Sequence, residues 1–197
     1  MTSVGDQATS SSLSEPAAGP SAPAVSWEDE CRFEALVADP SVAATIATCA
    51  MRAGAPRESA EEFLGSWAGA LIVGGAMLRG AERGRERALR WGLQTGKSRT
   101  EEFALPIGRV TVAVLCSLAR KRLLLQGVEQ RPDGCTLTAR IPSDARTFGG
   151  VLRVSVDRTA TGTVVHAAAE IPGQLFDWGV SKKTVATLLT DIPVLLA

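Results

Sequence analysis

Two segments in the last third of the sequence carry the side chains best suited to binding chemistry. Segments 141–149 and 171–179 both begin with Ile-Pro, and both then contain an acidic residue, an aromatic residue and a glycine. Aromatic walls with a few polar groups suit a small ligand or a peptide. The alternative is that both segments are plain connections, because proline and glycine are ordinary residues of turns at strand ends. The predicted ligand-binding residues are Asp144, Arg146, Phe148, Gln174, Phe176, Asp177 and Trp178.

A basic segment in the middle of the chain is the second candidate surface. If residues 76–90 are helical, four arginines fall on one side, and alanines and glycines at four-residue spacing form a separate ladder. Such a ladder of small residues lets another helix approach closely. We therefore predict an interaction surface for a protein partner or for self-association, formed by Arg79, Gly80, Arg83, Gly84, Arg87, Ala88 and Arg90.

These arginines also have acidic partners within the same chain. Residues 1–62 carry ten acidic and three basic side chains, whereas residues 79–122 carry four acidic and eleven basic ones. The whole chain has 21 of each and a net charge of zero. Compensation between neighbouring helices is the favoured interpretation, and a nucleic-acid partner is not expected. An anionic membrane surface, contacted by the apolar and basic segment 63–90, is the alternative partner.

Catalytic and metal-binding chemistry have little support in the sequence. Residues 92–98 are similar to a phosphate-binding loop, but the spacing is one residue short and the preceding pattern is helical, so a linker is predicted. The single histidine, His166, shares a strand face with Glu170, which lies about 13 Å away at 3.3 Å per residue. Its potential partners on a neighbouring strand are Arg153 and Ser155. No catalytic residue, cofactor or metal site is predicted, and an enzyme using the loop Asp and Arg residues is a further alternative.

The composition is that of a globular protein, with 45% hydrophobic and 21% charged residues. The four cysteines lie more than ten residues apart, which excludes a local zinc knuckle. They predict free thiols and a cytoplasmic location, although disulfides between distant cysteines stay open. Residues 1–25 lack Lys, Arg and a hydrophobic core, which predicts a disordered tail rather than a secretory signal.

Residues 26–119 form a predicted helical region. Ser26 would cap a helix that ends near Ala38, and Asp39-Pro40 would begin another helix that Gly54 stops. A long helix is expected over 60–91, and its sixteen uncharged residues are too few to cross a bilayer. A linker over 92–105 follows. The apolar run 107–119 contains several β-branched residues, which leave helix or strand open, with helix favoured.

Residues 120–197 predict four strands and a final helix, in one domain with the helical region or in a second. Strands are expected over 123–129 and 135–141, after Gly150, and over 163–171, and Ser181 would cap the helix. The predicted fold class is α+β, a helical N-terminal half followed by a four-stranded antiparallel meander covered by a C-terminal helix. The second and fourth strands of a meander run the same way, so both Ile-Pro loops leave one end of the sheet. We therefore predict a non-enzymatic binding or interaction protein with a pocket at that rim.

Overall fold

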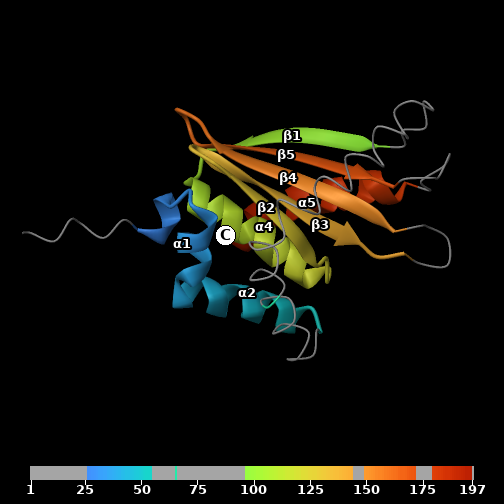
Figure 1. Ribbon diagram of the computed structural model, residues 1–197, viewed down its shortest axis with the longest axis horizontal. Coiled ribbons are helices and arrows are strands. Elements are labelled where there is room, and N and C mark those ends of the chain that lie inside the picture. Colours follow the sequence, from blue (N-terminus) through green and yellow to red (C-terminus); the bar gives the residue numbers. More distant parts are fainter. Residues whose placement is uncertain (1–25, 55–64, 66–95, 144–148, 172–178, 197) are drawn as a thin grey trace, which may run out of the picture.

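The computed structural model describes residues 26–54, 65, 96–143, 149–171 and 179–196, and the fold is α+β. A β-sheet forms one layer, helices α4 and α5 pack on one face of it, and helices α1 and α2 lie on the far side of α4 (Figure 1). One buried hydrophobic cluster contains residues from all of these layers. The helices are η1 (Trp27–Asp29), α1 (Phe33–Ala38), α2 (Pro40–Arg52), α4 (Ile107–Arg120) and α5 (Val180–Leu196).

The sheet is antiparallel throughout and has five strands rather than the predicted four. Its spatial order is β1-β5-β4-β3-β2, so the four consecutive strands β2 to β5 form the predicted meander. The Pro132-Asp133 turn joins β2 to β3, as its composition indicates. The strands are β1 (Lys97–Phe103), β2 (Leu125–Arg131), β3 (Gly134–Ile141), β4 (Gly150–Arg158) and β5 (Thr163–Glu170).

Strand β1 corrects the prediction of a linker over 92–105. It pairs with β5 from Lys97 opposite Ala169 to Phe103 opposite Thr163, and it forms one edge of the sheet. The sequence pattern could not reveal this strand, because Phe103 is its only buried residue. An exposed edge strand needs no alternation of apolar and polar residues, and charged residues are common there.

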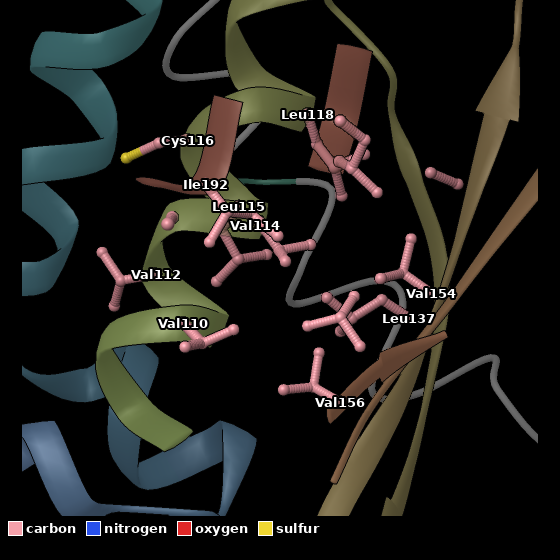
Figure 2. Packing of buried hydrophobic residues seen from close by; sticks show 14 of the residues in the cluster. Val110, Val112, Val114, Leu115, Cys116, Leu118, Leu137, Val154, Val156 and Ile192 are labelled. Carbon is pink, nitrogen blue, oxygen red and sulfur yellow. The ribbon is translucent and has the colours of Figure 1, made fainter. Parts of the chain in front are cut away.

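Helix α4 resolves the ambiguity over 107–119 in favour of a helix. Nearly all of its residues are buried, because the sheet lies on one side and α2 on the other. Figure 2 shows Val114 and Leu118 directed toward the strands, whereas Cys116 points toward α2. A helix that is apolar on all sides is stable only when it is enclosed, and here tertiary packing outweighs the strand preference of its β-branched residues.

The N-terminal helices follow the predicted caps, with one correction. Ser26 accepts a hydrogen bond from the Glu28 amide, but the helix it begins is a single 3-10 turn, and α1 starts separately at Phe33. Phe33 is fixed by the side chain of Gln130 on β2, whose Oε1 accepts from its amide at 2.8 Å. The predicted single helix over 27–38 is therefore two short helices, held against the edge of the sheet.

The Asp39 cap of α2 makes the stability of this helix depend on pH. Its carboxylate accepts a hydrogen bond from the Ser41 amide at 2.8 Å, and hydrogen bonds from Ser41 lower the pKa of the carboxyl. The cap therefore stabilises fully above the unfolded pKa of about 4, and this contribution is lost as pH falls through the lower folded value. We expect Asp39→Ala to lower the melting temperature at pH 6, and the difference from wild type to shrink toward pH 2.

The matched control is Glu34→Ala on α1, an exposed carboxylate that caps no helix. It should leave the melting temperature nearly unchanged across the same pH range. A difference for Asp39→Ala that stays constant from pH 6 to pH 2 would contradict the cap.

Helix α5 covers the sheet beneath β1 and β5, as the predicted C-terminal helix should. It begins at Val180, directly after Gly179 with φ of 77°, a left-handed conformation that favours glycine. The prediction that Ser181 caps this helix is wrong, because Ser181 lies inside its first turn with a fully buried side chain. The buried stripe of Val185, Leu188, Leu189 and Ile192 is as expected.

Candidate functional site

Both predicted surfaces fall entirely outside the described residues. Segments 144–148 and 172–178 contain all seven predicted ligand-binding residues, and segment 66–95 contains the whole arginine and glycine surface. The membrane-surface and enzymatic alternatives depend on the same segments, so they stay predictions. The described residues do locate the points from which these segments leave the sheet.

Strand direction brings the two Ile-Pro loops to one end of the sheet. Strands β3 and β5 both run antiparallel to β4, which lies between them. Ile141 at the end of β3 is paired with Gly150. A Cβ atom built on Gly150 would lie 2.9 Å from Ile171 Cγ1. The predicted strand directions are therefore correct, and the two loops start at the same end of the sheet, on either side of β4.

The segment before β1 reaches the same end of the sheet. Lys97 is paired with Ala169, and a Cβ atom on Gly96 would lie 3.4 Å from Glu170 Cγ. This end of the sheet, formed by Gly96, Ile141, Gly150 and Ile171, is called the loop end below.

The sheet face opposite α4 and α5 is polar, and near the loop end it carries two arginines. Arg140 stands opposite Val151, and Arg153 stands opposite Thr138, so the two arginines are diagonal neighbours on adjacent strands. Such diagonal positions lie about 7–8 Å apart. Neither arginine makes an ion pair with any residue that the structure describes. The two guanidinium groups can therefore donate to a carboxylate or phosphate, which they match geometrically.

His166 lies on the same polar face, further from the loop end, in a row of small hydroxyl side chains. The row runs across four strands through Thr136, Ser155, His166 and Thr100. Ser155 is the register partner of His166, as predicted, but the hydrogen bond of His166 is with Thr100, Nδ1 to Oγ1 at 2.8 Å. Sequence reasoning missed Thr100, because strand β1 was expected to be a linker.

A polar cluster between α4 and α5 has a structural role. Ser117, which is fully buried, donates a hydrogen bond of 2.7 Å to Asp191. Lys121 Nζ lies 3.6 Å from the same carboxylate, and burial lowers the pKa of this amine. These contacts tie α5 to the end of α4.

A hollow of about 310 Å³ lies at the opposite end of the sheet, where Arg158 is paired with Thr163. It is bounded by the β4–β5 turn and by Leu105, Pro106 and Ile107 at the start of α4. Arg158 already donates a hydrogen bond to the Asp29 carbonyl there. This hollow therefore belongs to the docking of the N-terminal segment and is separate from the loop end.

The four cysteines are free thiols. Burial raises the pKa of Cys135 to about 12. Burial also raises the pKa of Cys116, with a smaller effect from Cys49 on α2. Both buried thiols are therefore protonated at neutral pH and are poor nucleophiles.

The described part of the chain shows neither a metal-binding cluster nor a membrane-spanning helix. It contains no group of three or more His, Cys, Asp or Glu side chains placed to hold a metal ion. Within it, no helix combines the length and the apolar character needed to span a bilayer. Comparison of the chain with protein-family models, curated proteins and solved structures finds no match.

Proposed function

We propose that this protein is a non-enzymatic binding protein, whose pocket lies at the loop end and takes a small ligand or a peptide. The observation that carries the proposal is that Ile141 and Ile171 flank the same residue, Gly150, from the two strands on either side of β4. Loops that start this close together can share one ligand. The aromatic and charged residues of segments 144–148 and 172–178 would form its walls.

The chemistry of the polar sheet face supports an anionic group on the ligand. Arg140 is exposed and lies on β3, the strand that leads into the first loop. Arg153 is half-buried and lies on β4, the strand between the two loop starts. Among the described residues neither arginine has an ion-pair partner, so both guanidinium groups can donate hydrogen bonds to an anionic ligand. The proposed ligand therefore combines an aromatic or apolar group with a carboxylate or phosphate.

Binding can be tested with a set of pentapeptides that contain one aromatic residue and a free acidic side chain, monitored by amide chemical shifts. The expected result is that binding peptides shift the amides of Ser143, Gly149 and Ile171 at the loop end. The amides of Glu129 and Arg131, at the other end of the sheet, should not move.

Two substitutions test separately the contact with an anionic group and the contact with an aromatic or apolar group of the ligand. Arg153→Ala should weaken binding about tenfold or more, as expected for the loss of a charge-assisted hydrogen bond, and Trp178→Ala should weaken it through the loss of an aromatic wall. The matched control, Arg52→Ala, removes an exposed arginine at the end of α2 and should not change the affinity. Equal affinity in all three variants, or shifts only outside the loop end, would overturn the proposal.

A further inference from the structure

The free edge of strand β1 carries a pattern of charges that is complementary to itself. Among the residues that the structure describes, no element pairs with the edge of β1 that faces away from β5. Residues 97–100 and 102 are exposed. An unpaired edge presents a row of backbone donors and acceptors to another strand. We propose that two copies of this chain associate by antiparallel pairing of their β1 strands, centred on Thr100.

Symmetry limits the registers that such a pairing can take. A two-fold axis that relates two antiparallel strands stands perpendicular to the sheet and runs midway between the strands, so the residue beside the axis faces its own copy. The residues on either side of it then pair across the axis. For a strand of seven residues, only centres near the middle give extensive pairing.

The charges select one of the three central registers. A pairing centred on Arg99 would place two arginines opposite each other, and one centred on Glu101 would place two glutamates opposite each other. A pairing centred on Thr100 places Arg99 opposite Glu101 of the second copy, twice. Opposite charges at facing positions stabilise a strand pair, whereas like charges destabilise it.

The side chains already lie on the correct face for this contact. Arg99 is the register partner of Ala167 and Glu101 is that of Val165, so both point to the face of the sheet that carries α5. Within one chain they form an ion pair of 3.4 Å, and their side chains are 58% and 35% exposed. Pairing would extend this ion pair into a network of four charges across the axis. Association should therefore weaken as the salt concentration rises.

Reversing the charge of Arg99 or Glu101 tests the pairing, because each change acts twice across the two-fold axis. Arg99→Glu places like charges opposite each other at two equivalent positions, and it should weaken dimerisation at least about tenfold by sedimentation equilibrium. Glu101→Arg should do the same. The double variant, Arg99→Glu with Glu101→Arg, restores opposite charges and should bring the dimerisation constant back close to that of wild type. Circular dichroism spectra should be the same for all variants, because both positions are on the exposed edge.

The register can be tested with single cysteines. Facing residues in an antiparallel pair have Cα atoms about 4.5–5.5 Å apart, which a disulfide can bridge. Thr100→Cys should therefore give a disulfide-linked dimer on mild oxidation. Ser98→Cys is the matched control. Its two copies would lie about 13 Å apart, four residues along the strand, and should not link. Wild type, treated in the same way, should stay unlinked.

Three outcomes would overturn the proposal. A chain that stays monomeric at millimolar concentration and low salt has no such interface. Loss of dimer in Gly84→Leu, but not in Arg99→Glu, would place self-association on the predicted glycine ladder. Equal disulfide formation in Ser98→Cys and Thr100→Cys would show that the contact lacks a fixed register. None of these results depends on ligand binding at the loop end, so the two proposals fail independently.

Discussion

Leu118→Ala is expected to lower the free energy of unfolding by about 3 kcal/mol, within a range of about 2–5 kcal/mol for such substitutions. Leu118 is fully buried in α4, and its side chain points into the space between this helix and the sheet (Figure 2). Removing three carbon atoms there loses the favourable free energy of burying them away from water, and it leaves a cavity. The surrounding strands are tied by backbone hydrogen bonds and cannot close this cavity fully.

The control for this substitution makes the same chemical change on the surface. Leu124 follows α4 by a few residues and is 36% exposed. Leu124→Ala should cost clearly less than Leu118→Ala, because about a third of the Leu124 surface already contacts water and no enclosed cavity is left behind. Urea unfolding followed by circular dichroism measures both values. Equal losses for Leu118→Ala and Leu124→Ala would show that α4 is not the centre of the core.

Gly134→Ala is the second substitution with a large expected effect. A Cβ atom at Gly134 would lie 2.1 Å from the Val156 carbonyl oxygen, a backbone atom of the neighbouring strand. This glycine is paired with Asp157, and the Arg131–Asp157 ion pair of 2.8 Å lies beside it. A side chain there must push β4 away from β3, which breaks ladder hydrogen bonds and separates the ion pair.

We expect this substitution to lower the free energy of unfolding by about 2–3 kcal/mol, at the upper end of the usual cost of overpacking. Gly65→Ala is the matched control, because a Cβ atom at Gly65 would meet no atom within 4 Å. That change should leave the stability unchanged or raise it slightly. Unfolding midpoints in urea distinguish the two variants. A neutral effect of Gly134→Ala would mean that the β3–β4 hairpin can widen without cost.

Local chemistry was sufficient to predict the elements whose signals lie in their own residues. The Asp39-Pro40 cap, the Pro132-Asp133 turn and the alternation of strands β3 and β4 all appear in the structure where they were expected. A cap and a turn depend on a few adjacent residues, and alternation reflects burial of one strand face. The direction of the strands follows from the connections between consecutive strands, and it places both loop starts at one end of the sheet.

Other features depended on partners that lie far away in the sequence. Strand β1 has no apolar alternation, and only its pairing with β5 makes it a strand. The hydrogen bond between Thr100 and His166 follows from that pairing, so it could not be foreseen. Ser181 has the character of a cap, yet packing against the core placed it inside α5.

The sequence alone therefore determined that the C-terminal part forms the four strands of a meander followed by a helix, and in which direction the meander runs. Only the tertiary structure decided the fifth strand, the enclosed position of α4 and the identity of the free sheet edge. The physical reason is the range of the interactions. Caps, turns and amphipathic patterns act between residues close in the chain, whereas an edge strand and a fully apolar helix take their conformation from surfaces supplied by distant segments.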